Sequence, residues 1–200
     1  MTNLERSRRK LASYVTVPAG RFLARTPLTP DVLTWIGFFI TFGAAVLVVL
    51  EYFVAAGLVY LGAALFDMLD GALARETGKS TKFGAVLDSS LDRMAEGVVL
   101  LGLVVMFART GEPWEAMLAG MTMLFSFMVS YIKARMEGLG IECKAGFFTR
   151  PERVALLTVA LLVGWNHDAL VVLLSILAFL SLLSAGERLI YAKRHAREQG

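Results

Sequence analysis

The chain has 200 residues, of which 56% are hydrophobic and only 18% are charged. This composition excludes an ordinary soluble domain, because a chain of this length could not hide all of its long apolar runs from water. The net charge of +3 fits basic loops facing a negatively charged membrane leaflet, so we do not expect nucleic acid as a partner.

The N-terminal segment, residues 1–28, is basic and has apolar residues at helical spacing. Leu4 and Leu11 alternate with charged residues such as Arg8 and Lys10. This pattern predicts an amphipathic interfacial helix that lies on the membrane surface.

Residues 29–200 are predicted to form one all-α domain with six transmembrane helices. A run of 18 or more apolar residues crosses the hydrocarbon core unaided, and a shorter run must draw in flanking helix. The apolar runs are about Leu33 to Leu50, Tyr52 to Phe66, Ala85 to Phe107, Trp114 to Ile132, Val154 to Trp165 and Ala169 to Tyr191.

The basic residues gather on one side of this predicted topology. Six Lys or Arg lie in residues 1–25, three in residues 75–82, five in residues 133–153 and four from Arg188 onward, whereas the opposite side has only Arg109. Because basic loops favour the cytoplasm, we expect a multi-pass protein of the cell membrane with both termini facing the cytoplasm.

Four aspartates interrupt the apolar runs. Asp67 and Asp70 follow the second run, and Asp88 and Asp92 lie in the third. Steps of three or four residues keep two side chains on one helix face. Carboxylates in a bilayer are costly and are therefore interpreted first as functional, and an oxygen-only ligand set suits Mg²⁺ or Mn²⁺ better than zinc. The two pairs are predicted to meet in the cytoplasmic third of the membrane.

The segment between the two pairs predicts a helical hairpin that brings the pairs face to face. Gly78 is a candidate helix C-cap, and Gly71 and Gly84 leave room for a ligand or a second backbone. Arg75 lies near the same helical side as the first two aspartates, where it can pair with a carboxylate or a phosphate.

A second polar cluster is predicted near the start of the fifth apolar run. Pro151 suits a first helical turn, and the helix start adds partial positive charge beside Arg150 and Arg153. We interpret the cluster as a phosphate pocket, with extension of the side chains to lipid headgroups as the alternative. Glu96 is expected to pair with Arg93 on the same helix. The candidate phosphate ligands are Lys133, Arg135, Arg150, Arg153 and Arg194.

The aspartates belong to a longer pattern, Asp67-x-x-Asp70-Gly71-x-x-Ala74-Arg75 followed by Gly84-x-x-x-Asp88-x-x-x-Asp92. This pattern resembles the signature of the CDP-alcohol phosphotransferase family. The resemblance implies a dimeric membrane enzyme that displaces CMP from a CDP-linked lipid with an alcohol.

The resemblance also implies roles for individual residues. Asp67, Asp70, Asp88 and Asp92 would hold two Mg²⁺ ions, with Mn²⁺ as a substitute, and Asp92 would also be the catalytic base. Thr29 and Pro30 give residues 31–34 a second interpretation as the start of a helix. The implied contacts to CDP-diacylglycerol are Asp31, Val32, Leu33, Thr34, Gly71, Arg75 and Thr81.

Four stretches of the sequence narrow the choice of acceptor. Residues 66–75, 83–88, 130–135 and 150–153 are similar to actinobacterial members of the family that make phosphatidylinositol phosphate. Inositol 3-phosphate is therefore the expected acceptor, with its phosphate in the cationic cluster. Glycerol phosphate or uncharged inositol is the alternative acceptor. A carboxylate-lined divalent-cation or proton transporter is an alternative of another class, although it leaves Arg75 and the 150–153 cluster unexplained.

Overall fold

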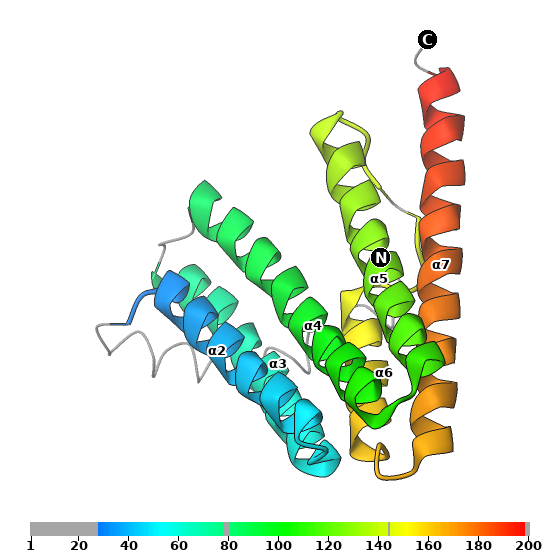
Figure 1. Ribbon diagram of the computed structural model, residues 1–200. Helices are drawn as coiled ribbons and strands as arrows, with labels where there is room; N and C mark the ends of the chain where they lie inside the picture. Colours follow the sequence, from blue (N-terminus) through cyan, green and yellow to red (C-terminus); the bar gives the residue numbers. More distant parts are fainter. Residues whose placement is uncertain (1–27, 78–80, 144, 199–200) are drawn as a thin grey trace, which may run out of the picture. The chain divides into compact units, whose positions relative to one another are not determined.

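The computed structural model describes residues 28–77, 81–143 and 145–198, and these residues contain six helices and no strand (Figure 1). The predicted all-α class is confirmed for this part of the chain. Residues 1–27 of the predicted interfacial segment and the predicted cap Gly78 lie outside the described residues. The helices are α2 Pro30–Val49, α3 Phe53–Thr77, α4 Lys82–Thr110, α5 Pro113–Gly138, α6 Arg150–Leu162 and α7 His167–Glu198.

Three of the described helical segments are long and apolar enough to cross a membrane: Pro30–Val49, Pro113–Gly138 and His167–His195. The apolar part of α3, Phe53–Asp67, is shorter. α6 has 13 residues and is about 20 Å long, less than the hydrocarbon core of about 30 Å. Length and composition therefore identify fewer spans than the six expected from the apolar runs.

The chain divides into two compact units, residues 1–40 with 62–92 and residues 41–61 with 93–200. The described part of the first unit contains the starts of α2 and α4 and the end of α3. Thr29 caps α2, because its Oγ1 accepts a hydrogen bond of 3.4 Å from the amide of Val32. Thr81 caps α4 in the same way through a 2.8 Å hydrogen bond from the amide of Gly84. Both caps fix helix starts that carry candidate site residues.

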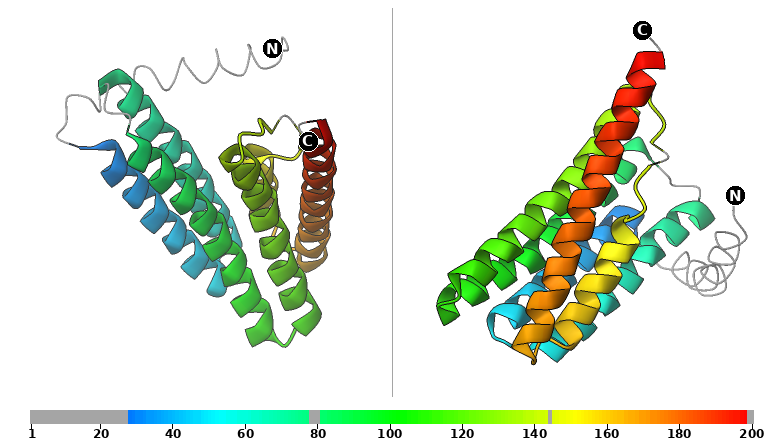
Figure 2. Two further views of the ribbon diagram at one scale, coloured as in Figure 1. Left: turned by 90° about the horizontal axis from the view of Figure 1, so that it is seen from above. Right: turned by 90° about the vertical axis from the view of Figure 1, so that its right-hand side faces the viewer.

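The second unit has one large apolar core to which α2 through α7 all contribute. Glycines allow close packing there: a Cβ on Gly102 would lie 3.0 Å from the carbonyl oxygen of Ala45, and one on Gly57 would lie 3.1 Å from the amide of Leu162. Such small residues let membrane helices approach closely. α7 packs along both α5 and α6 (Figures 1 and 2).

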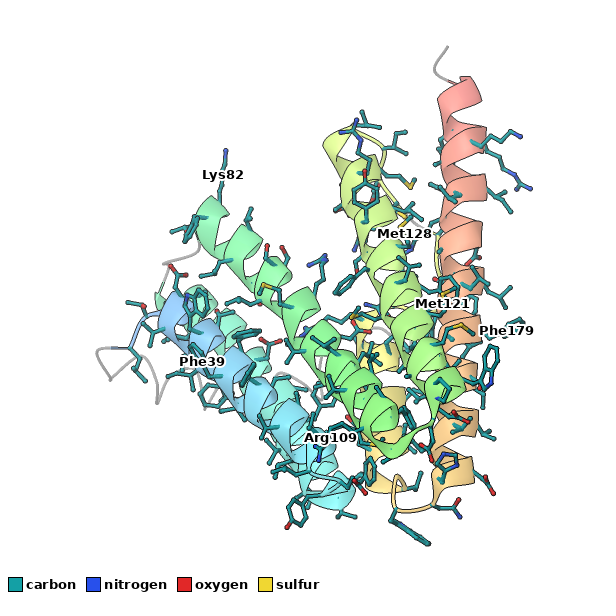
Figure 3. All side chains as sticks on the ribbon, in the orientation of Figure 1. Phe39, Lys82, Arg109, Met121, Met128 and Phe179 are labelled. Atoms are coloured by element: carbon teal, nitrogen blue, oxygen red, sulfur yellow. The ribbon has the colours of Figure 1, made fainter. Side chains whose placement is uncertain are left out.

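The outward faces of the second unit are also apolar. Met121 and Met128 of α5 and Phe179 of α7 are exposed (Figure 3). At the ends of the helices, Arg109 donates a hydrogen bond of 3.1 Å to the carbonyl oxygen of Val49, the last residue of α2. An apolar exterior of this kind suits a lipid surrounding.

Candidate functional site

Three of the four predicted metal ligands converge in the first unit. Asp67 comes from α3 and Asp88 and Asp92 from α4, and each offers a carboxylate oxygen within 4.8 Å of the other two. All three side chains are half-buried. Carboxylates at such distances repel one another unless a cation or a proton lies among them. An all-oxygen set of this kind fits a hard divalent cation such as Mg²⁺ or Mn²⁺.

Asp70 lies one turn after Asp67 on α3, as its spacing predicted. The structure describes only the backbone of Asp70, Gly71 and Arg75 within α3, so their predicted roles remain predictions.

The starts of α2 and α4 approach each other closely beside this cluster within the first unit. A Cβ on Gly84 would lie 3.0 Å from Thr81 Oγ1 and 3.1 Å from Asp31 Oδ1. Both distances are shorter than ordinary van der Waals contact, so glycine is what allows this approach. The structure therefore brings two predicted substrate contacts, Asp31 and Thr81, to one place.

The other predicted contacts at the start of α2 differ in exposure. Val32 is exposed, whereas Leu33 and Thr34 are buried at 1% and 5% exposure. The hydroxyl of Thr34 donates to the carbonyl oxygen of Pro30 at 3.1 Å. These contacts support the interpretation of the segment as a helix start, and its role toward a ligand stays a prediction.

Arg153 lies in a buried ion pair in the second unit. Its Nε donates to Glu96 Oε1 at 2.8 Å and its Nη2 donates to Glu96 Oε2 at 2.9 Å, with Arg153 only 1% exposed and Glu96 only 2%. Ser130 Oγ accepts a third, longer hydrogen bond of 3.4 Å from Nη2. A bidentate charge-assisted pair of this kind fixes both side chains strongly. Arg93 was the predicted partner of Glu96, and this prediction is wrong because Arg153 binds both carboxylate oxygens of Glu96.

α6 begins where the sequence predicted, with Pro151 in its first turn. Glu152 forms a capping box with Thr149, accepting a 3.0 Å hydrogen bond from the backbone amide of Thr149. The capping box and the proline hold Arg150 at the N-terminal end of α6, where the helix supplies partial positive charge.

The connection between α5 and α6 is held by α7. Three side chains of α7 contact three residues of the connection through hydrogen bonds of 3.3 Å each. Ser184 donates to the carbonyl oxygen of Phe148, Tyr191 donates to that of Glu142, and Glu187 accepts from the amide of Phe147. The segment that leads into α6 therefore has a defined place against α7.

Arg188 is a buried cation that the sequence analysis left out of the site. It is 4% exposed, and its Nη1 donates to the carbonyl oxygen of Val129. Its guanidinium lies against Gly146, whose φ of +100° is a conformation that favours glycine. The signal that could have identified it is its position inside the last apolar run, Ala169 to Tyr191, because a charged residue within a membrane span is rarely without a use.

The remaining predicted cations lie near the ends of α5 and α7. Lys133 Nζ lies 3.7 Å from Glu137 Oε1. Arg135 and Arg194 are exposed, and Arg135 lines an apolar groove between α5 and α7. Their assignment to a phosphate ligand stays a prediction.

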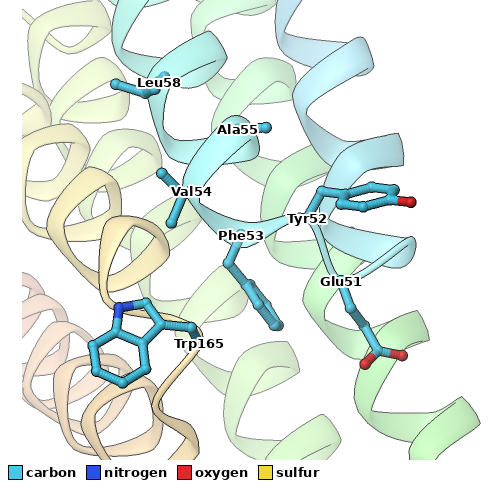
Figure 4. Close-up of a pocket in the computed structure, with 7 residues that line it drawn as sticks. All are labelled: Glu51, Tyr52, Phe53, Val54, Ala55, Leu58 and Trp165. Atoms are coloured by element: carbon cyan, nitrogen blue, oxygen red, sulfur yellow. The ribbon is translucent and has the colours of Figure 1, made fainter.

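A further hollow of about 680 Å³ opens at the start of α3 (Figure 4). Tyr52 and Trp165 lie on opposite sides of Phe53 there, and Glu51 is the one charged residue in its lining. A hollow without a basic residue offers no ligand for a phosphate.

Comparisons with known proteins identify the family to which the chain is similar. A family model described as CDP-alcohol phosphatidyltransferase matches residues 27–185. The phosphatidylinositol phosphate synthase of Mycobacterium tuberculosis (strain H37Rv) is 40% identical over 156 residues, which cover 77% of this chain and 72% of that protein.

Crystal structures of the Mycobacterium tuberculosis enzyme match the fold. The structure with CDP-DAG bound has a TM-score of 0.84 at 35% identity and covers 90% of this chain and 94% of that chain. The structure in complex with manganese and citrate has a TM-score of 0.81 at 35% identity and covers 89% of this chain and 88% of that chain.

Proposed function

The chain belongs to the CDP-alcohol phosphatidyltransferase family, and from that premise we propose that it transfers the phosphatidyl group of CDP-diacylglycerol to inositol 3-phosphate. The products are phosphatidylinositol phosphate and CMP. The observation that carries this proposal is the convergence of Asp67, Asp88 and Asp92, whose oxygens lie within 4.8 Å of one another. Family membership confirms the predicted reaction class. It argues against the alternative function, a divalent-cation or proton transporter.

A divalent metal suits this donor set, and the related enzyme crystallised with manganese supports that assignment. We propose two Mg²⁺ ions, replaceable by Mn²⁺, held by Asp67, Asp70, Asp88 and Asp92. When bound, such ions supply positive charge that binds the diphosphate and stabilises the leaving CMP.

The side chains of the protein are assigned two roles, proton transfer and orientation of the substrate. Asp92 accepts the proton of the acceptor hydroxyl as that oxygen attacks the β-phosphorus, the phosphorus next to the diacylglycerol. Asp31, Thr81 and Arg75, with the backbone around Gly71 and residues 32–34, orient the CDP head group. The close approach at Gly84 keeps Asp31 and Thr81 together. This set of roles is the one implied by the family pattern.

The acceptor phosphate is assigned to the cationic cluster of the second unit. Of the five cations predicted from the sequence, Lys133, Arg150, Arg153 and Arg194 are its proposed ligands, whereas Arg135 lines the groove between α5 and α7 and is left out. Arg188 is added because its buried Nε has no hydrogen-bond partner among the described residues. Arg153 is the least accessible member, since Glu96 binds two of its nitrogens. An uncharged acceptor would bring no negative charge to the buried guanidinium of Arg188.

The protein is membrane-embedded, as its apolar helices and its family indicate. We further propose that residues 29–200 form six spans, that residues 1–28 lie on the membrane surface, and that the enzyme is a homodimer. The distribution of Lys and Arg supports cytoplasmic termini and a cytoplasmic active site.

One assay tests the proposal. Purified protein in detergent would be given labelled CDP-diacylglycerol with inositol 3-phosphate, glycerol 3-phosphate or myo-inositol, and CMP release would be measured with and without EDTA. We expect release with inositol 3-phosphate, and its loss in EDTA. Equal or greater release with glycerol 3-phosphate or myo-inositol would overturn the acceptor, and no release with any alcohol would overturn the enzyme assignment.

A further inference from the structure

An apolar groove of about 360 Å³ lies between α5 and α7 where both helices approach their C-terminal ends. Ile132 and Met136 are buried at 5% and 3% exposure, Ala192 packs against the same small cluster, and Leu139 forms an exposed wall. The volume lies in the range of sites that bind small molecules. Of the residues that line this groove, only Arg135 was among the predicted site residues.

Two cations stand among the residues that line this groove, Arg135 and Lys193. Both are exposed, and neither forms an ion pair with a carboxylate in the part of the chain that the structure describes. Lys133, by contrast, has its charge balanced by Glu137 at 3.7 Å. No acidic residue lines the groove. An apolar channel beside two uncompensated cations complements a molecule with a hydrocarbon tail and an anionic head.

The position of the groove along the helices agrees with such a ligand. The apolar sequence of α5 ends at Ile132, and charged residues follow directly. Tyr131, which is 62% exposed, lines the groove at this boundary. Tyrosines at this level mark the membrane–water interface, and basic residues there attract anionic lipids. A free phosphate could use the cations but would have no use for the apolar channel.

We propose that this groove binds one anionic phospholipid, with the lipid phosphate on Arg135 and Lys193 and an acyl chain along Ile132 and Met136. Arg135 then serves a lateral lipid site and not the acceptor phosphate. The lipid comes from the leaflet at the C-terminal ends of α5 and α7. The proposal stands independently of the transfer reaction, because the groove would bind a lipid that is not consumed.

Retention of a defined lipid tests the proposal. The full chain would be reconstituted in vesicles of phosphatidylcholine with one-tenth phosphatidylglycerol and extracted in mild detergent, and the bound phosphatidylglycerol would be measured by native mass spectrometry. Arg135→Gln and Lys193→Gln are each expected to lower retention about fivefold, because each removes one cation from the lipid phosphate. Lys82→Gln is the matched control, since it removes an exposed lysine outside the groove and should leave retention unchanged.

A second pair of variants tests the apolar half of the site. Ala192→Phe fills the groove without changing charge and should lower retention at least as strongly, whereas Ala134→Phe adds the same ring at an exposed position of α5 and should not. Thermal melting checks that both phenylalanine variants fold. If Ala192→Phe does not fold, Arg135→Gln and Lys193→Gln still test the proposal.

Three results would overturn the proposal. The first is equal retention of phosphatidylglycerol by the parent, Arg135→Gln and Lys193→Gln. The second is a raised KM for inositol 3-phosphate in Arg135→Gln with lipid retention unchanged, which would return Arg135 to the acceptor site. The third is conversion of a dimer to a monomer by Ala192→Phe with lipid retention unchanged, which would make the groove an interface between two copies of the chain.

Discussion

Replacing Arg153 by methionine should destabilise the second unit strongly, because the substitution leaves the carboxylate of Glu96 buried without its partner. Arg153 and Glu96 are 1% and 2% exposed, and the hydrogen bonds that join them are 2.8 and 2.9 Å long. Breaking a buried pair by removing one partner costs about 3–5 kcal/mol. For a chain of this size, the loss corresponds to a melting temperature roughly 10 °C lower.

Thermal unfolding in detergent, followed by circular dichroism, measures this effect. A second variant in which Glu96→Leu accompanies Arg153→Met should recover most of the loss, because an apolar pair of similar volume carries no buried charge. Lys133→Met is the control, since it removes one partner of an exposed pair that is worth less than about 1 kcal/mol. A melting temperature of Arg153→Met within two degrees of the parent would refute the reasoning.

The same variants decide how a loss of activity is to be interpreted. Lower CMP release by Arg153→Met alone reports misfolding as readily as a missing acceptor ligand. If the double variant is stable but has a raised KM for inositol 3-phosphate, Arg153 also binds the acceptor. If the double variant recovers both stability and KM, the role of Arg153 is to balance Glu96.

Three other outcomes are expected. Asp88→Asn should lower CMP release at least about 100-fold, since it weakens the predicted metal site. EDTA should abolish CMP release by the parent until Mg²⁺ or Mn²⁺ is restored. CMP release that does not change in EDTA would contradict the metal assignment. Gly84→Ala should raise the KM for CDP-diacylglycerol several-fold, because its methyl group would push against Asp31 Oδ1 at 3.1 Å, whereas Gly43→Ala, with nothing within 4 Å, should have the kinetics of the parent. Gly146→Ala should lower the melting temperature by several degrees, because φ is +100° there and a residue with a Cβ is strained in that conformation by about 1–2 kcal/mol; an unchanged melting curve would exclude that strain.

The acidic site could be predicted from the sequence because its geometry is local. Asp88 and Asp92 share a helix face by spacing alone, and a short connection returns the chain so that Asp67 meets them. Helix starts were also predictable, because Thr29 and Pro151 obey rules that involve only a few neighbouring residues.

The buried ion pair could not be predicted in this way. Glu96 and Arg153 are 57 residues apart, and no local rule ranks Arg153 above Arg93 as the partner. The end of α3, by contrast, was predictable from local rules. The spacing of Asp67 and Asp70 required the helix to continue past the apolar run that ends at Phe66, and α3 ends at Thr77, directly before the candidate cap Gly78.

The attachment of the α5–α6 connection to α7 has a thermodynamic consequence. Ser184 and Tyr191 donate hydrogen bonds to the segment just before Arg150, and Glu187 accepts one from it, so the segment is held in place without any ligand. The conformational entropy of this segment is therefore lost during folding and not during the catalytic cycle. If the proposed acceptor phosphate binds at the start of α6, calorimetry should record an association without the large unfavourable entropy of a loop that orders around its ligand.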